Sequence, residues 1–161
     1  LLEHLPFFER QTWPQTARAL LASDADRSTE EETAALLHEA RGVLENPALS
    51  EIFSHGALAE VPISADIAQL GGRRIHGVID RLIVTQDRVL AVDFKTNAAV
   101  PTTVSQCPDG LLRQMGAYAL ALAQIYPERE ISNALLWTKT GELMTLPHDI
   151  VINAVSRTQI S

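Results

Sequence analysis

The sequence predicts an α/β domain in which helices flank a central mixed sheet and a helical segment precedes it. Three observations support this fold class. Helical patterns occupy residues 1–58, strand patterns begin at residue 60, and a long helical pattern at residues 109–126 separates two groups of strands. We therefore expect a single domain over residues 1–161, in which residues 59–161 form the sheet and its helices.

Helical signals recur along the N-terminal segment. Ser28-Thr-Glu-Glu31 is a capping box, in which Ser28 is the N-cap and Glu31 reaches back to it. A proline at a first helical position marks two other starts, at Pro14 and Pro47. The expected helical stretches are the end of a helix within residues 1–8, then residues 14–22, 28–45 and 47–53.

Alternating apolar residues predict the strands. In residues 60–68 the apolar side chains of Val61, Ile63, Ala65 and Ile67 share one face, as in a half-buried strand. The other strand patterns lie at residues 74–84, 88–95, 132–138 and 143–146, and a short helix is expected from about residue 149.

The hairpin over residues 77–95 carries charged residues where a core strand would have Val or Ile. A turn centred on residues 86–87 with an even number of loop residues places Asp80 directly opposite Asp93. Opposed side chains have Cβ atoms roughly 5 Å apart, and like charges at that distance repel. A positive group is therefore expected between the two carboxylates.

Lys95 follows Asp93 by two residues, so both side chains project from the same face of the strand. Carboxylate ligands at this spacing suit Mg²⁺, as one or two ions, with Mn²⁺ as an alternative. A lysine beside such an ion can orient or deprotonate an attacking water. The pattern is typical of a hydrolase that acts on phosphodiesters.

Three motifs follow one another in order: Gly77-x-x-Asp80-Arg81, Asp93-x-Lys95-Thr96 and Gln114-x-x-x-Tyr118. Together they resemble the RecB-type branch of the PD-(D/E)XK nuclease superfamily. Residues 1–6 and 59–62 extend the resemblance to the C-terminal nuclease domain of AddA-type helicase-nucleases. The resemblance implies a restriction-endonuclease-like core and a Mg²⁺-dependent deoxyribonuclease, acting as an exonuclease in double-strand-break repair.

The resemblance also implies roles for individual residues. The catalytic residues would be Asp80, Asp93, Lys95 and Glu60, the metal would be held at Asp80, Asp93 and Phe94, and the substrate would contact Gln114, Tyr118, Arg81 and Thr96. Gln114 and Tyr118 are four residues apart and so share one face of the expected helix, which can hold an amide and a phenol against the metal site.

The sequence leaves the position of Glu60 open. An even turn between the first two strands places Glu60 on the face opposite Asp80, whereas a bulge brings it to the side of the site. A catalytic role and a strand-end hydrogen-bond or salt-bridge role are therefore both open.

The net charge, the cysteine count and the lengths of the apolar runs limit how the domain can bind DNA and where in the cell it works. The net charge of −7 argues against a free-standing duplex binder, so DNA must be delivered by other domains or subunits. The single cysteine, Cys107, excludes an internal disulfide and fits the reducing cytoplasm. No apolar run approaches the roughly 20 residues of a membrane span, so no membrane association is expected.

Leu1 is not a natural start, so we expect a fragment of a longer polypeptide that also carries helicase domains. The resemblance places a metal-binding helix histidine of the family just before Leu1 and implies an AddB-like partner subunit. A single cysteine cannot supply the four ligands of an iron–sulfur cluster. Two alternatives stay open: an inactive nuclease-like domain that binds DNA ends or a partner subunit, and a free-standing RecB-like exonuclease.

Overall fold

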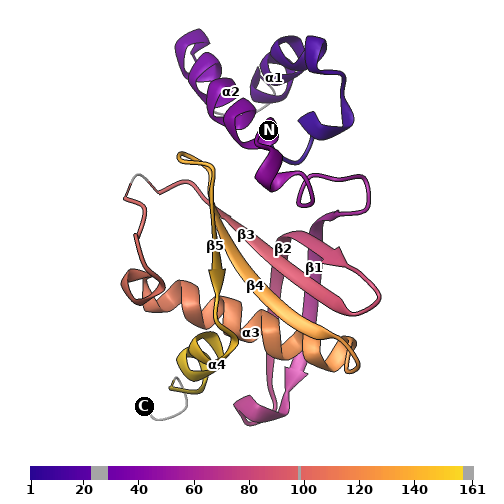
Figure 1. Ribbon diagram of the computed structural model, residues 1–161, viewed down its shortest axis with the longest axis vertical. Coiled ribbons are helices and arrows are strands. Elements are labelled where there is room, and N and C mark those ends of the chain that lie inside the picture. Colours follow the sequence, from indigo (N-terminus) through magenta and orange to yellow (C-terminus); the bar gives the residue numbers. More distant parts are fainter. Residues whose placement is uncertain (23–28, 98, 158–161) are drawn as a thin grey trace.

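A five-stranded mixed sheet forms the centre of the computed structural model, which describes residues 1–22, 29–97 and 99–157 (Figure 1). The strands are β1 Leu58–Ile67, β2 Arg73–Val84, β3 Arg88–Lys95, β4 Glu130–Trp137 and β5 Glu142–Leu146. The α-helices are α1 Trp13–Ala22, α2 Glu30–Leu44, α3 Asp109–Ile125 and α4 His148–Ser156. These elements confirm the predicted fold class.

The strands lie in the order β1-β2-β3-β4-β5, so neighbours in the chain are neighbours in the sheet. All neighbouring pairs are antiparallel except β3 and β4, which are parallel. A parallel pair requires a crossover, and α3 provides it across one face of the sheet. This crossover carries the Gln114 motif back over the strands that hold the two aspartates.

The helix α3 is held between the sheet and α4. Its apolar side chains, including Leu112, Met115 and Leu122, are buried in the larger core with residues of all five strands. Gly116 lies so close to α4 that a Cβ there would meet the backbone carbonyl of Val151. The absence of a side chain thus lets the two helices pack in direct contact.

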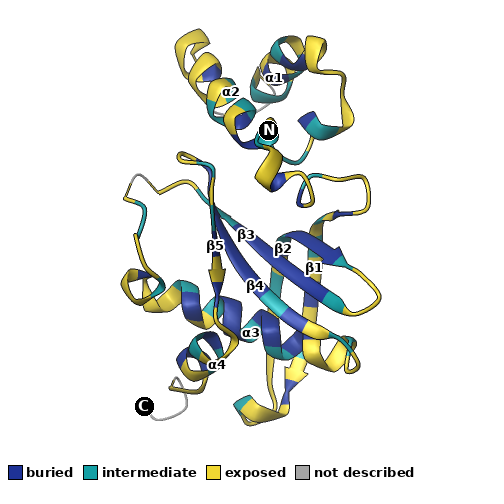
Figure 2. Cartoon of the chain, in the orientation of Figure 1, coloured by how far each residue is buried: buried dark blue, intermediate teal, exposed yellow. Residues whose placement is uncertain are grey.

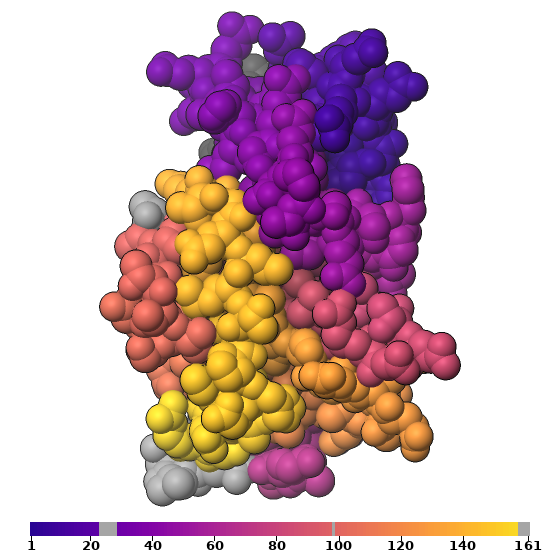
Figure 3. Space-filling view, viewed as in Figure 1, coloured from indigo at the N-terminus to yellow at the C-terminus, as the bar shows by residue number. Residues whose placement is uncertain are grey.

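The N-terminal segment forms a separate lobe at one end of the sheet (Figure 3). Its helix α2 begins at the capping box of Thr29 and Glu32, one residue later than the sequence predicts. Ser28, the expected N-cap, lies outside the described residues. The expected helices at residues 1–8 and 47–53 are shorter than predicted, with 3₁₀ turns at Leu5–Phe7 and Pro47–Leu49.

Burial follows this division into a sheet and a lobe (Figure 2). The main core lies between the sheet and the α3 and α4 layer, and a second cluster joins Val43, Leu49 and Ile52 to the opposite face of the sheet. A third cluster of Leu5, Trp13 and Ala40 closes the lobe itself. None of the described helices has the length and apolar character that a bilayer crossing demands.

Candidate active site

The strands β2 and β3 separate part-way along their length. Their paired residues run from Val84 and Val89 to Arg81 and Val92, as the predicted hairpin register requires. Beyond that point β2 pairs with β1, and β3 pairs with β4, so the sheet opens between them. We call this opening, with Asp80 and Asp93 at its closed end, the fork site.

Asp80 occupies the closed end of the fork site in an unexpected way. The predicted register is confirmed, but the ladder stops one pair before Asp80 and Asp93. Instead, the backbone N–H of Phe94 donates to Asp80 Oδ2 at 2.6 Å. The Asp80 side chain thus accepts the hydrogen bond that a backbone carbonyl of β2 would accept in a regular strand pair. Burial raises the pKa of Asp80, the hydrogen bond from Phe94 opposes that change, and the nearby Asp93 carboxylate adds to it.

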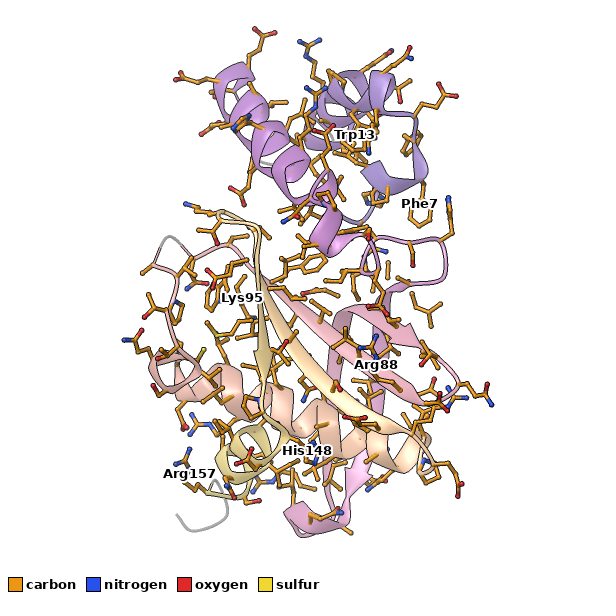
Figure 4. The ribbon with its side chains drawn as sticks, viewed as in Figure 1. Phe7, Trp13, Arg88, Lys95, His148 and Arg157 are labelled. Atoms are coloured by element: carbon orange, nitrogen blue, oxygen red, sulfur yellow. The ribbon has the colours of Figure 1, made fainter. Side chains whose placement is uncertain are left out.

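Asp93 is almost fully buried, and two groups contact its carboxylate. Lys95 Nζ forms an ion pair with Oδ2, which supplies the positive group that the sequence demands near the two carboxylates. Gln114 Nε2 donates to Oδ1 at 3.3 Å. Lys95 is placed near the end of β3 (Figure 4), and its side chain is only 18% exposed, so the ion pair is largely shielded from water.

The Gln114 motif acts as a brace across the fork site. Gln114 Nε2 donates to Tyr118 Oη at 3.0 Å, and Tyr118 Oη donates to the carbonyl of Val78 at 3.1 Å. The phenol ring lies directly on Gly77, where an added Cβ would come within 2.6 Å of the ring. The glycine of the first motif therefore makes room for the tyrosine of the third.

The structure places Glu60 beside the fork site. Val61 pairs with Ile79 and Ala59 with Arg81, so Glu60 lies across from Asp80. Its φ of 50° is in the left-handed region, which costs free energy for a residue with a side chain. Burial raises the pKa of Glu60, and the neighbouring carboxylates of Glu3 and Asp80 raise it further.

Glu3 is a site neighbour that the sequence did not single out as a functional residue. Its carboxylate lies near enough to those of Glu60 and Asp80 to raise the pKa of both groups. The only signal in the sequence was its place in the motif-like stretch at residues 1–6. Long-range contacts of this kind have no periodicity that a sequence could reveal.

Arg81 and Thr96 occupy different surroundings from the two aspartates. The Arg81 side chain is 1% exposed, donates to the carbonyl of Leu2 at 2.8 Å and stacks over the ring of Phe53. These contacts tie the N-terminal segment to β2. Thr96 is exposed and borders a hollow of about 280 Å³ between the lobe and the end of β3. Substrate contact by either residue stays a prediction.

The N-terminal lobe also contacts β3, through residues that the sequence did not single out. The backbone N–H of Thr138 donates to the carbonyl of Lys95 at 3.0 Å, and the Thr138 hydroxyl donates to Glu39 of α2. Thr138 is buried, so this polar contact lies in a site of low water access. It fixes the strand end that carries Lys95.

The donor atoms of the fork site suit a hard divalent cation. Within residues 1–22, 29–97 and 99–157, no three His, Cys, Asp or Glu side chains are gathered closely enough to hold a metal by themselves. Two carboxylates match Mg²⁺, which binds through few protein ligands and keeps several waters. The carboxylates of Asp80 and Asp93 face one lysine, and the Asp80 carboxylate also lies near enough to Glu60 to raise its pKa, so the local charge favours a cation.

The sequence of the chain matches a family profile described as the PD-(D/E)XK nuclease superfamily over residues 5–151. The chain belongs to this superfamily. A solved structure described as "Crystal structure of SSO0001" is similar at a TM-score of 0.38 and 10% identity, covering 94% of this chain and 86% of that one. No curated protein matches the chain. That Asp80, Asp93 and Lys95 occupy the motif positions of the superfamily stays a prediction.

We expect Gly77→Ala to lower the free energy of unfolding by about 1–3 kcal/mol, because its Cβ would overlap the ring of Tyr118. In a Tyr118→Ala background the same change should cost much less, which a double-mutant cycle in urea would measure. Gly56→Ala is the matched control, since a Cβ there meets nothing within 4 Å. Additive effects of Gly77→Ala and Tyr118→Ala would contradict the packing described.

We expect Asp80→Asn to stabilise the metal-free protein at neutral pH. The pKa of Asp80 is raised in the folded protein. At low pH the Asp80 carboxyl is therefore neutral in both the folded and the unfolded protein. As the pH rises, its ionisation costs the folded protein more free energy than the unfolded protein. The gain in melting temperature should therefore be absent near pH 3.5 and present near pH 8, in chelator. Asp87→Asn, in the exposed turn, is the control. Equal melting temperatures of wild type and Asp80→Asn at neutral pH would refute this account.

Proposed function

We propose that the chain is a divalent-metal-dependent deoxyribonuclease domain that hydrolyses phosphodiester bonds at the fork site. The observation that carries this proposal is the meeting of Asp80, Asp93 and Lys95 at the point where β2 and β3 separate. An ordinary exposed hairpin would have no reason to bury a carboxylate beside a second one. Such an arrangement costs stability unless it serves binding or chemistry.

Asp80 and Asp93, with the backbone carbonyl of Phe94, would hold Mg²⁺ or Mn²⁺ in this proposal. When bound, the ion supplies Lewis acidity that polarises the scissile phosphodiester. The protein contributes the orientation of the ligands. Phe94 N–H fixes the carboxylate of Asp80, and Gln114 fixes that of Asp93, so neither group has to be ordered when substrate arrives.

Lys95 would act on the attacking water and on the charge that gathers at the phosphoryl oxygens. As a cation it cannot be a ligand of the metal, and its ion pair holds its ammonium group against Asp93. Hydrolysis forms a bond from the water oxygen to phosphorus and breaks the bond to the leaving oxygen. A fixed positive charge beside these atoms stabilises the transition state more than the ground state.

We further propose that the domain works in an AddA-type helicase-nuclease with an AddB-like partner, on double-strand breaks in the cytoplasm. Two features support this finer assignment: the order of the three motifs and the net charge of −7. An acidic domain binds duplex DNA weakly by itself, so a motor that feeds the strand would raise its effective concentration at the site.

The test is cleavage of a labelled single-stranded oligodeoxynucleotide with and without Mg²⁺. We expect cleavage only with the metal, and its loss in Asp93→Asn, because a neutral amide is a much poorer ligand for a hard cation. Asp87→Asn removes a carboxylate from an exposed turn and should cleave like wild type. Metal-independent cleavage, or full activity of Asp93→Asn, would overturn the proposal.

We expect Lys95→Ala to lower the cleavage rate at saturating Mg²⁺ by about a hundredfold, since one well-placed charge is worth roughly 3 kcal/mol in the transition state. Calorimetry should show Mg²⁺ affinity unchanged or tighter, because the lysine competes with a cation for Asp93. Lys95→Arg should not restore the rate, since its guanidinium places the charge elsewhere. Equal rates at saturation would reduce Lys95 to a structural counter-charge.

A further inference from the structure

We propose that a hollow between β2 and α3 binds the sugar-phosphate backbone of the DNA strand that enters the fork site. This inference rests on the proposed nuclease function and adds the surface that holds its substrate. The hollow has a volume of about 310 Å³ and lies between the start of β2 and the first turns of α3. The residues that argue for DNA are Arg73, Arg113 and Gln114, with Gly110 at the helix end of the hollow.

The charge of the hollow is opposite to that of the chain. Two of its lining residues are arginines, and none of its described lining residues is acidic, although the chain carries a net charge of −7. The hollow also lies at the start of α3, where backbone N–H groups give the helix a partial positive end. A phosphodiester is the ligand class that such a field attracts and that the fork site would cut.

Gln114 connects the hollow to the fork site. It lines the hollow, and its amide nitrogen donates to Asp93 Oδ1 and to Tyr118 Oη. Gly110, Arg113, Gln114 and Ala117 recur at three- and four-residue intervals, so they form one face of α3. This face of α3 therefore joins the arginine-lined hollow, through Gln114, to Asp93.

Arg113 can exchange its present partner for a phosphate at little cost. It pairs with Asp109 at 2.7 Å, and Arg157 contacts the same carboxylate at 3.1 Å. Two positive charges thus share one negative charge. Because the three side chains are about half exposed or more, each pair contributes little stability. Arg157 lies just after α4 and can keep Asp109 paired when Arg113 turns to the strand (Figure 4).

Arg73 and Arg74 provide a comparison within the chain itself. Arg73 lines the hollow, and within the part of the chain that the structure describes it forms no ion pair. Arg74 projects to the other face of β2, as neighbours in a strand do, and forms a two-bonded pair with Asp66 at 2.8 and 2.7 Å. One arginine is thus free to bind, and the next is already occupied.

The apolar lining of the hollow suits the rest of a nucleotide. Leu70, Ile75 and Ala117 line it beside the two arginines. Deoxyribose and base faces pack against such surfaces, whereas an isolated phosphate would use only the arginines. The combination favours a nucleic acid strand over an inorganic anion.

The test measures binding separately from cleavage. Anisotropy of a labelled single-stranded oligodeoxynucleotide in chelator reports binding by the chain, and cleavage with Mg²⁺ is followed in parallel. We expect Arg73→Ala and Arg113→Ala each to weaken binding roughly three- to tenfold at low ionic strength, with Arg74→Ala as the matched control that does not. The slope of log Kd against log salt should fall by about 0.7 per lost contact in the first two variants only.

The two proposals fail in different ways. If wild type cleaves DNA but Arg73→Ala and Arg113→Ala bind with the affinity and salt slope of Arg74→Ala, the hollow is not the strand site and the nuclease function stands. If the arginine variants lose binding while no Mg²⁺-dependent cleavage occurs, the strand site stands and the nuclease function fails. If wild type neither binds nor cleaves, both are refuted.

Gly110 offers an independent variant that keeps all charges. A Cβ at Gly110 meets nothing within 4 Å, so a side chain can be introduced there without a clash in the folded chain. Gly110→Leu extends into the hollow and should weaken oligonucleotide binding several-fold while leaving the salt slope unchanged, because no phosphate contact is removed. Unchanged affinity of Gly110→Leu, with a folded protein by circular dichroism, would overturn the assignment of the hollow.

Discussion

The hydrogen bond from Phe94 N–H to Asp80 is the interaction on which the rest of the site depends. The Asp80 carboxylate takes the place of a backbone acceptor on β2. The N–H of Phe94 therefore keeps a hydrogen-bond partner where β2 and β3 separate. The opening that results is what α3 fills with Gln114 and Tyr118. Asp80, to which we assign metal binding, thus has a structural role as well, and the bond that orients it offsets part of the cost of its burial.

Polar contacts join the N-terminal lobe to the site, in addition to the hydrophobic cluster of Val43, Leu49 and Ile52 on the sheet. Arg81 reaches back to Leu2, Glu3 contacts Glu60, and Glu39 accepts from Thr138, which holds Lys95. Such contacts stabilise only when both partners are present, because a single buried partner left alone is costly. The lobe therefore positions the end of β3 and the first strand around one carboxylate cluster.

The sequence contained most of the fold and the centre of the site, because both depend on local rules. Alternation located the strands, and the hairpin register brought Asp80 and Asp93 to neighbouring strands. The sequence did not show that the ladder ends at Arg81 or that Tyr118 lies on Gly77, because the latter contact joins residues 41 positions apart in the chain. The contacts of Glu3 and Thr138 with the site were not predicted for the same reason. The left-handed backbone of Glu60 had no residue signature, because glycine is the usual one.

The parallel pairing of β3 with β4 has a consequence for the order in which the molecule assembles. The hairpin of β2 and β3 closes a short loop, whereas β4 can join only after the whole α3 crossover has been placed. The two aspartates therefore come together early, before Gln114 and Tyr118 arrive. The folding chain must tolerate this repulsive encounter until Gln114 and Tyr118 are in place.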